Sequence, residues 1–310
     1  MAHQGLRVTA ADERKTVTRA AVSVVGLGAM GSAVAGTFLE AGHPTTVWNR
    51  SSGKADPLVE RGAVHAATVG EAFGASPLVV LCVLDDSAAR ETLAPLGARR
   101  ATGRVLANLT TGTPEQARRM ADWAEERGIG YLDGGVLGDP EQVGSPASRF
   151  YYSGSRDAFE AHRRTLEVLG EGTSYLGDDA GLASVYLMAL VGLSYEIWVS
   201  YLNTLALLGA EGVSAAAFAP TATGVLGPTL DLLEEFARAA DEGDYPPVAG
   251  PLRTHAPLMD DLIDGWRARG VPVDRLRHVR DLVDRRVAEG RGEEGFSSLI
   301  EAIRERNAST

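Results

Sequence analysis

The sequence predicts an α/β protein in which a doubly wound parallel sheet is joined by one long helix to an all-helical C-terminal domain. Between residues 21 and 177, short apolar segments rich in β-branched residues alternate with segments of helical periodicity. This alternation is typical of a parallel sheet covered by helices on both faces. Residues 180–210 form an apolar run without proline, and only helical periodicity follows it. The 310 residues are enough for two domains.

The composition is that of an ordinary soluble globular protein, with 45% hydrophobic and 23% charged residues. A net charge of −11 argues against a nucleic-acid-binding surface and against attraction to an anionic membrane. The single cysteine, Cys82, lies in an apolar strand pattern, so we predict no disulfide and no metal site. Residues 1–20 are polar and lack the apolar core of a secretory signal, which predicts a flexible extension of a cytoplasmic protein.

The first strand pattern, residues 21–25, leads into Gly26, Gly28 and Gly31, which have the spacing G-x-G-x-x-G. The first glycine permits a tight turn, the second lets the backbone approach a pyrophosphate, and the third lets helix and strand pack closely. The helix pattern over residues 30–40 would receive the phosphates at its positive end. A second strand pattern follows, in the order that a dinucleotide site requires. We therefore assign cofactor contacts to Gly26, Leu27, Gly28, Ala29, Met30 and Gly31.

The residues after the second strand pattern, which covers residues 45–48, indicate which dinucleotide is bound. NAD sites usually carry Asp or Glu about 20 residues beyond the glycines, where the carboxylate holds the ribose 2′-hydroxyl. This chain instead has Asn-Arg-Ser-Ser-Gly-Lys at positions 49–54. Arginine, lysine and serine side chains can bind a 2′-phosphate, which a carboxylate would repel. We therefore predict NADPH, held at this end by Asn49, Arg50, Ser51 and Lys54.

The next strand pattern ends in residues that should line the cofactor cleft, because ligands bind beyond the carboxyl ends of parallel strands. Residues 78–83 form this apolar pattern, and Val83, Leu84 and Asp85 stand at its end. Asp86 is predicted to cap the helix that follows.

A further strand pattern, residues 104–107, runs into a stretch rich in short hydrogen-bonding side chains. Asn108 and Thr110 are predicted to meet the nicotinamide ribose or amide at this strand tip. Thr113 is better explained as a helix cap, because proline follows it and Gln116 completes a capping box.

The last part of the sheet begins with residues 130–135, which repeat the pattern of a strand followed by glycines. The loop over residues 136–147 is predicted to be a mobile wall of the cleft. Strand patterns over 150–153 and 173–176 flank a helix pattern over 156–169 and complete the parallel sheet.

Residues 180–210 contain one charge, Glu196, and are apolar nearly all round. A helix that is apolar on every side must be covered on every side, either by a membrane or by the partner chain of an interwoven oligomer. The uncharged run over residues 180–195 is shorter than the roughly 20 residues that a membrane span needs, and no basic cluster flanks it. The pattern therefore favours the central helix of a dimer over a membrane segment.

The rest of the chain predicts an all-helical domain whose helices are separated by proline and glycine, among them Pro220, Gly224 and Pro228. Helix patterns with a 3.6-residue period cover residues 215–218, 230–240, 256–269 and 273–289, and a last amphipathic helix begins at Gly295.

Five stretches resemble the NADPH-dependent imine reductases, relatives of the β-hydroxyacid dehydrogenases: GLGAMG, VWNRS, NLTTGTPEQAR, YLDGG and EGRGEEGFSSLIEAIR. The resemblance covers residues 23–304. It implies a Rossmann domain, a long inter-domain helix and a helical domain exchanged between two subunits, with the active site at the dimer interface. We therefore divide the chain into an extension over 1–20, an NADP-binding domain over 21–178, the inter-domain helix over 179–210 and a helical dimerisation and substrate domain over 211–310.

The chain departs from these families at one position. The β-hydroxyacid dehydrogenases carry a catalytic lysine at the start of the long helix, imine reductases usually carry aspartate or tyrosine there, and this chain has Leu187. Leucine cannot transfer a proton, whereas carbonyl reduction needs acid–base help at the oxygen. Hydride addition to an iminium ion requires only proximity and orientation, which an apolar wall does not disturb.

Helical spacing brings Leu187, Val191, Ser194 and Trp198 close to one stripe with Tyr195 at its edge, and we assign this stripe together with Leu137 to the substrate pocket. Trp198 or Tyr195 can stack on a cationic substrate, and Tyr195 or Tyr186 is the candidate proton donor. The alternative is that these aromatic residues only pack. Two other ionisable residues are predicted to be structural: His255, and Asp133 as part of a turn.

The sequence thus predicts an NADPH-dependent reductase of C=N bonds that acts on a cyclic imine or iminium as a domain-swapped cytoplasmic homodimer. Two alternatives stay open. In the first, the chain reduces another activated double bond or performs reductive amination in specialised biosynthesis. In the second, it is a catalytically inactive NADP-binding sensor or assembly protein, which the absence of an acid at Leu187 would explain.

Overall fold

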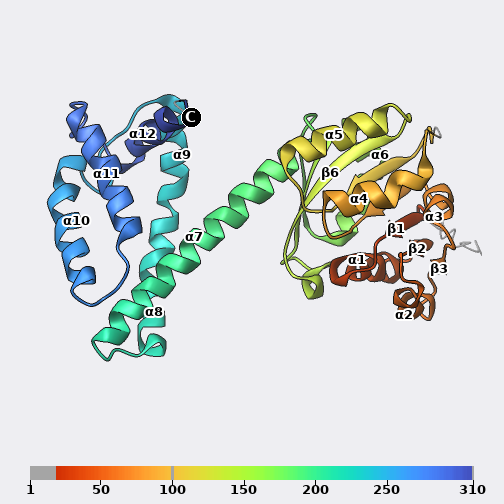
Figure 1. The fold of residues 1–310 in the computed structure, drawn as a ribbon, viewed down its shortest axis with the longest axis horizontal. Helices are drawn as coiled ribbons and strands as arrows, with labels where there is room; N and C mark the ends of the chain where they lie inside the picture. The colour runs from red at the N-terminus through yellow and green to blue at the C-terminus, as the bar shows by residue number, and fades with distance from the viewer. Residues whose placement is uncertain (1–18, 99–100, 309–310) are drawn as a thin grey trace, which may run out of the picture. The chain divides into compact units, whose positions relative to one another are not determined.

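The structure, a computed structural model, describes residues 19–98 and 101–308 (Figure 1). The predicted N-terminal extension over residues 1–20 lies outside this range except for its last two residues. The described chain divides into two compact units, of which the first ends at Gly192 and the second begins at Leu193.

The first unit is built on an eight-stranded sheet with the strand order β3-β2-β1-β4-β5-β6-β7-β8. The strands are β1 Val22–Val25, β2 Thr45–Trp48, β3 Val64–His65, β4 Leu78–Leu81, β5 Val105–Asn108, β6 Gly130–Leu137, β7 Arg149–Gly154 and β8 Gly172–Gly177. The α-helices between them are α1 Ala29–Glu40, α2 Asp56–Val59, α3 Val69–Ala75, α4 Asp86–Leu93, α5 Pro114–Glu125 and α6 Arg156–Leu166.

The sheet has a separate apolar core on each face, because neighbouring residues of a strand point to opposite sides. Val24 of β1 belongs to the same core as Phe38 of α1 and Phe159 of α6. Val25, the next residue, belongs to the other core with Met120 of α5. Helices therefore cover both faces, and the order of the first six strands is that of a dinucleotide-binding fold. The predicted doubly wound sheet is confirmed.

The direction of β7 differs from the prediction of an all-parallel sheet. β7 pairs antiparallel with β6, and β8 then runs parallel to β7. Parallel neighbours need a crossover connection, usually a helix, whereas only a short 3-10 turn, Pro140–Gln142, lies between β6 and β7. The chain therefore reverses direction at this point.

Two local boundaries also differ from the prediction. The predicted loop over residues 136–147 loses its first two residues to β6, because Val136 and Leu137 pair with Phe150 and Arg149 of β7. The cap of α4 is Asp85, whose carboxylate accepts a hydrogen bond of 2.8 Å from the Ala88 N–H. The prediction that Asp86 caps this helix was wrong by one residue.

The remaining helices are α7 Leu182–Ala210, α8 Ala215–Leu230, α9 Leu232–Glu242, α10 Leu252–Arg267, α11 Asp274–Ala288 and α12 Leu299–Ala308. Helix α7 begins in the first unit and continues into the second as one helix (Figure 1). The second unit has an apolar core in which Leu252 and Met259 of α10 pack with Val283 of α11 and Ala302 of α12. The predicted all-helical C-terminal domain is confirmed.

Helix α8 runs through Pro220 and Pro228, where the sequence predicted breaks. Proline removes one N–H donor from a helix and leaves the carbonyl four residues earlier without its partner. Those carbonyls belong to Ala216 and Gly224, which are both exposed. Water can bond them there, so the helix continues.

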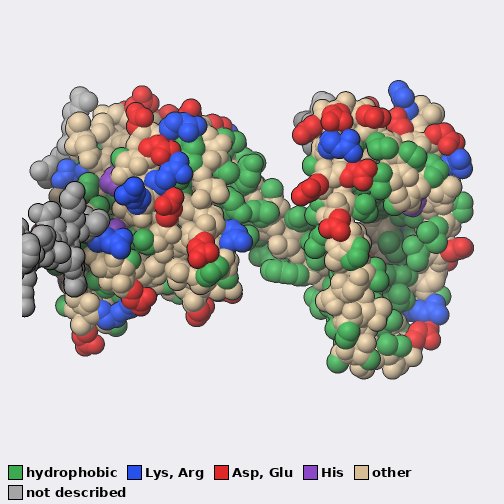
Figure 2. Space-filling view, turned by 180° about the vertical axis from the view of Figure 1, so that it is seen from behind, with side chains coloured by type: hydrophobic (Ala, Val, Ile, Leu, Met, Phe, Trp, Pro, Cys, Tyr) green, Lys and Arg blue, Asp and Glu red, His purple; other side chains and the backbone are tan. Residues whose placement is uncertain are grey.

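Helix α7 is predominantly apolar and mostly exposed in the single chain. It is long and apolar enough to cross a membrane by length and composition, with a mean hydropathy of 1.6, and only 11% of its most apolar stretch is buried. Large exposed side chains on it include Tyr186, Tyr195, Trp198 and Leu202. Figure 2 shows apolar side chains gathered on the surface of the second unit. Exposed apolar surface of this extent is typical of an interaction site.

Candidate functional site

The turn between β1 and α1 requires glycine at two positions for the fold itself. Gly26 has a φ of +96°, and a Cβ atom there would lie 2.2 Å from the carbonyl oxygen of Cys82. A Cβ atom on Gly31 would lie 2.0 Å from the carbonyl oxygen of Gly26. In contrast, a Cβ atom on Gly28 would meet nothing within 4 Å. The chain itself does not need glycine at position 28, which fits a position that a ligand approaches closely.

The start of α1 is suited to bind an anion. Its N-cap, Gly28, provides no side-chain cap, and the first turn has no acidic residue. Helices α3 and α4, in contrast, are capped by the side chains of Thr68 and Asp85. The first N–H groups of α1 and the positive end of its dipole are therefore available to a phosphate group.

A cleft of about 480 Å³ opens at this helix start. The residues predicted to bind the cofactor or to line its cleft all line this cleft, except Asp85, Asn108 and Thr110. Asp85 caps α4 instead. The cleft also includes residues that sequence reasoning missed, which stand at the ends of β2 and β4 and in α4: Trp48, Cys82, Ala88 and Thr92. The strand-tip rule that selected Val83 and Leu84 extends to Trp48 and Cys82. Burial raises the pKa of the Cys82 thiol to about 11, so it stays protonated and unreactive.

The loop after β2 forms the far end of this cleft. Asn49 braces it, since its Oδ1 accepts a hydrogen bond of 2.9 Å from the Leu27 N–H and its Nδ2 donates one of 3.0 Å to the Ser51 carbonyl. Arg50, Ser51 and Lys54 are exposed and line the cleft. The described residues that line this cleft include no carboxylate. This end of the cleft therefore suits a phosphate group better than a free ribose diol.

Asn108 and Thr110 lie at the tip of β5, in a hydrogen-bond network. The Asn108 Oδ1 accepts a bond of 3.1 Å from the Thr110 N–H, and its Nδ2 donates one of 3.2 Å to the Tyr131 hydroxyl. Thr110 Oγ1 accepts one of 3.2 Å from the Val83 N–H. Both side chains connect neighbouring strand tips, and their contact with a nicotinamide stays a prediction.

Asp133 lies in the middle of β6, which corrects its assignment to a turn. It is only 3% exposed, and its Oδ2 accepts a hydrogen bond of 2.7 Å from the hydroxyl of Ser184 on α7. The Tyr131 hydroxyl donates a longer bond of 3.4 Å to Oδ1. Burial raises the pKa of Asp133 to about 6, although the hydrogen bonds from the Ser184 hydroxyl, the Tyr131 hydroxyl and the Ser184 N–H favour the ionised form. Sequence reasoning missed this site because burial of a strand residue by a distant helix has no local signal.

Asp133 and Ser184 also line a small cavity at the tip of β5. Its volume is about 10 Å³, close to the minimum of roughly 10–15 Å³ that holds one water molecule. Its other walls come from the start of α4, the tip of β5 and the start of α5, where the predicted capping box of Thr113 and Gln116 is confirmed. The lining residues are Asp86, Asn108, Thr110, Thr111, Gly112, Thr113, Gln116, Ala117, Asp133 and Ser184.

The first turns of α7 are fixed closely against the sheet. The Ser153 hydroxyl donates to the Ala180 carbonyl and accepts from the Ala183 N–H, both at 2.9 Å. A Cβ atom on Gly135 of β6 would lie 3.0 Å from the Ala183 carbonyl oxygen and 3.3 Å from the Cβ atom of Leu187. The absence of a side chain at Gly135 therefore lets α7 approach β6 and sets the position of Leu187.

An ion pair holds the loop before α7. Arg118 donates to both carboxylate oxygens of Asp179, at 2.9 and 2.8 Å. The hydrogen bonds from Arg118 and from the Gly181 N–H lower the pKa of Asp179 to about 2. The bidentate geometry adds to the rigidity of the segment that leads to Leu187.

The predicted substrate-pocket residues divide between the two units. Leu137, Leu187 and Val191 belong to the first unit and are half-buried. Ser194 is half-buried in the second unit. A pocket formed by these residues stays a prediction.

The three predicted aromatic residues of α7 are exposed. The Tyr186 ring lies 6.0 Å from that of Tyr151. The rings of Tyr195 and Trp198 pack edge to face, with centroids 5.6 Å apart. A catalytic role for either tyrosine stays a prediction.

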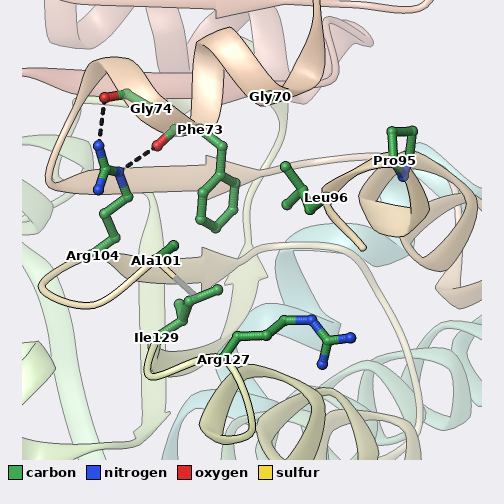
Figure 3. Close-up of a pocket in the computed structure, with 9 residues that line it drawn as sticks. All are labelled: Gly70, Phe73, Gly74, Pro95, Leu96, Ala101, Arg104, Arg127 and Ile129. Atoms are coloured by element: carbon green, nitrogen blue, oxygen red, sulfur yellow. Dashed lines mark hydrogen bonds between the residues drawn. The ribbon is translucent and has the colours of Figure 1, made fainter. Parts of the chain in front are cut away.

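Two further features do not belong to this site. A pocket of about 200 Å³ lies at the amino ends of the strands, and Figure 3 shows two arginines in it. Arg104 donates to the carbonyl groups of Phe73 and Gly74 at the end of α3, and Arg127 donates to that of Trp123. Both therefore serve backbone carbonyls of the fold. His255 is packed edge-on against a phenylalanine ring, as expected of a structural residue. Residues 19–98 and 101–308 hold no group of three metal-binding side chains.

Comparison with known proteins gives consistent matches to both parts of the chain. Residues 21–177 match the family described as the NAD binding domain of 6-phosphogluconate dehydrogenase. Residues 179–305 match the family described as NADPH-dependent reductive aminase-like, C-terminal domain.

Individual proteins match over nearly the full length. An NADPH-dependent reductive aminase of Aspergillus oryzae is 34% identical over 284 residues, which cover 90% of this chain and 96% of the relative. The structure of a reductive aminase from Aspergillus terreus in complex with NADPH and ethyl levulinate has a TM-score of 0.82 and 40% identity, with 92% and 100% of the two chains covered. The structure of an imine reductase from Aspergillus terreus in complex with NADPH4 and dibenz[c,e]azepine has a TM-score of 0.86 and 39% identity, with 92% and 99% of the two chains covered.

Proposed function

Because the chain belongs to the family of NADPH-dependent reductive aminases and imine reductases, we propose that it reduces the C=N bond of a cyclic imine or iminium with NADPH as its cofactor. The observation that carries this proposal is the pair formed by an uncapped, acid-free helix start at Gly28 and a half-buried leucine at position 187. The first suits the cofactor, and the second suits a substrate that arrives as a cation.

NADPH fits the described cleft on the chemistry of its lining. The glycine turn and the first N–H groups of α1 would bind the pyrophosphate. Arg50, Ser51 and Lys54 would bind the 2′-phosphate, with no carboxylate nearby to repel it. Asn108 and Thr110 would lie toward the nicotinamide. When bound, NADPH supplies the hydride that reduces the imine carbon.

Leu187 gives the proposed site an apolar wall that excludes water, and it does not supply a proton. An iminium carbon accepts hydride without acid catalysis, so binding and orientation supply the acceleration. An apolar wall at Leu187 leaves the positive charge of such a substrate undisturbed. The same leucine disfavours carbonyl reduction, which needs a proton at oxygen.

A matched pair of substrates tests this function. We expect NADPH consumption with a dihydroisoquinoline and with its N-methyl iminium salt. The rate with the permanent cation should stay flat with pH, because that substrate needs no proton. The rate with the neutral imine should fall as the pH rises. Tight NADPH binding without turnover of either compound, measured by fluorescence titration, would instead favour the inactive NADP-binding protein.

Reductive amination is the second candidate, favoured by the 34% identity to a protein named as a reductive aminase. In that reaction a carbonyl compound and an amine lose water to form the imine that is then reduced. Supplying cyclohexanone with a small primary amine, and comparing the rate with that of the preformed imine, separates the two. Turnover of the preformed imine alone would leave imine reduction as the activity.

If Arg50 binds the 2′-phosphate, its substitution should weaken the binding of NADPH. Arg50→Asp should raise the KM for NADPH by roughly 10- to 100-fold, because a charged hydrogen bond is lost and a repulsive carboxylate is added. The KM for NADH should fall or stay unchanged. Arg119→Asp, an exposed position on α5, changes the net charge equally and serves as the control. Equal losses in the two variants would show only a general effect of charge.

The functional unit in this proposal is a domain-swapped homodimer in the cytoplasm. The exposed apolar side chains of α7 continue onto α8 with Val225 and Leu226, and a groove of about 460 Å³ lies between the two helices within the second unit. An exposed apolar surface of this extent is typical of an interface, and a symmetric partner can cover it. A buried cysteine without a disulfide is consistent with a reducing compartment.

Leu202→Glu tests the dimer. Leu202 is 61% exposed on α7, and a charge there would have to be buried in the proposed interface. We expect light scattering to show a monomer, with loss of activity. Val64→Glu, at an exposed apolar residue of the edge strand β3, should leave mass and activity unchanged. A Leu202→Glu variant that remains an active dimer would contradict this interface.

A further inference from the structure

We propose that Asp133 and Ser184 form a proton relay to the substrate nitrogen, in place of the acid that is absent at Leu187. Asp133 acts through Ser184 and is a positioning and proton-storing residue. The relay rests on the proposed C=N reduction and adds a proton source to it. It applies to neutral imines, which need a proton that a permanent iminium does not.

Geometry connects the pair to the expected position of the substrate. Ser184 lies three residues before Leu187 on α7, so the two side chains share one face of the helix. Asp133 and Gly135 likewise share one face of β6. Asp133 bonds Ser184 on this face, and Gly135 lies beneath Leu187. The Ser184 hydroxyl is therefore about one helical turn from the position of Leu187, with the Asp133 carboxyl group bonded to it.

A short path leads from the pair to the tip of β5. Ser184 and Asp133 line the cavity of about 10 Å³ that also reaches Asn108 and Thr110. One water molecule in this cavity would extend the reach of the Ser184 hydroxyl. Asp86 lines the same cavity, is 12% exposed and pairs with Arg90 on the surface, which gives the cavity a route for protons from solvent.

The surroundings of Asp133 allow its carboxyl group to hold a proton close to neutral pH. The groups that face it are Tyr131 from its own strand, Asn108 beside it on β5, and the hydroxyl and backbone N–H of Ser184 in the first turn of α7. Ser153 of β7 stands opposite in the ladder, and across the cavity lie Gln116 and the one acidic group there, Asp86. None of these described neighbours is a cation that would hold Asp133 ionised. Burial therefore dominates and raises the pKa of Asp133 to about 6.

The proposed step balances as follows. The Ser184 hydroxyl, directly or through the cavity water, gives its proton to the imine nitrogen and takes the carboxyl proton of Asp133. The π bond of C=N breaks, one N–H bond forms with the relayed proton, and one C–H bond forms with the hydride. The imine is reduced and the nicotinamide is oxidised. Asp133 recovers a proton from solvent before the next turnover.

Asp133→Asn is the decisive variant, because asparagine keeps the shape and can still accept the Ser184 hydrogen bond but carries no acidic proton. We expect the rate with the neutral dihydroisoquinoline around pH 7, where part of Asp133 still carries its proton, to fall about a hundredfold, a typical contribution of a general acid. The loss should shrink at higher pH, where Asp133 is ionised. The rate with the N-methyl iminium should change by less than twofold. Ser184→Ala should likewise lower the rate with the neutral imine far more than the rate with the N-methyl iminium. Ser184→Thr, which keeps a hydroxyl group, should retain part of the rate with the neutral imine.

Ser153→Ala is the matched control, since Ser153 anchors the same helix start without a hydrogen bond to Asp133. Any loss it causes should affect both substrates equally. Equal losses for both substrates in Asp133→Asn, or an unchanged rate with the neutral imine, would overturn the relay. An infrared titration of the unliganded chain should also show a protonated carboxyl signal that Asp133→Asn removes. If the wild-type protein turns over neither compound, the proposed function itself fails.

Discussion

Gly28→Ala is expected to weaken NADPH binding by about a hundredfold, or ~2.8 kcal/mol, while the unliganded chain loses about 1 kcal/mol or less through the poorer helix cap. The structure separates these two effects. A Cβ atom on Gly28 meets nothing within 4 Å, and its φ of −70° suits any residue. The loss of affinity would come only from the bound state, in which the second glycine of the fingerprint must let a pyrophosphate approach the backbone.

Two further substitutions make this experiment specific. Gly31→Ala places a Cβ atom 2.0 Å from the Gly26 carbonyl oxygen, so it should lower the melting temperature of the unliganded chain as well as binding. Gly74→Ala, where a Cβ atom also meets nothing within 4 Å, should leave binding unchanged and should raise the melting temperature slightly, because alanine favours the interior of helix α3. Fluorescence titration and thermal unfolding measure the two quantities. Wild-type affinity in Gly28→Ala would show that the cofactor does not bind at this turn.

Arg286→Ala is expected to destabilise the helical unit by about 3 kcal/mol, because it leaves two carboxylates without their shared partner. Arg286 of α11 is 7% exposed, and its guanidinium donates to Glu289 at 2.5 Å and to Glu294 at 2.6 Å. Both glutamates belong to the stretch EGRGEEGFSSLIEAIR, which resembled imine reductases. In part, therefore, that stretch supplies two glutamates that pair with a buried arginine and hold the loop after α11.

The neighbouring arginine is the control for this effect. Arg285 has a side chain that is 40% exposed and pairs with Glu305 at 3.5 Å. An exposed pair of this kind contributes about 0.2–1 kcal/mol, so Arg285→Ala should shift the urea midpoint far less than Arg286→Ala. Urea unfolding followed by helical circular dichroism measures both. Equal midpoints for the two variants would show that water replaces the ion pairs of Arg286 at no cost.

The sequence by itself determined those parts of the molecule whose signals are local. The strand Thr45–Trp48, the capping box at Thr113 and the unbroken run of α7 each depend on residues within a few positions of one another. The glycine spacing after β1 is local for the same reason, and it led to the doubly wound sheet and to the cleft residues. The family resemblance, now confirmed, rested on these short stretches.

Tertiary structure decided the features that depend on contacts between distant segments. The reversal at β7 follows from which strand pairs with β6, and α8 passes its prolines because the freed carbonyls are exposed. Asp133 and Ser184 are 51 residues apart, and only the packing of α7 on β6 brings them to 2.7 Å and buries the carboxylate. Burial and pairing are properties of the whole packed chain, so a sequence pattern with a period of two to four residues cannot report them.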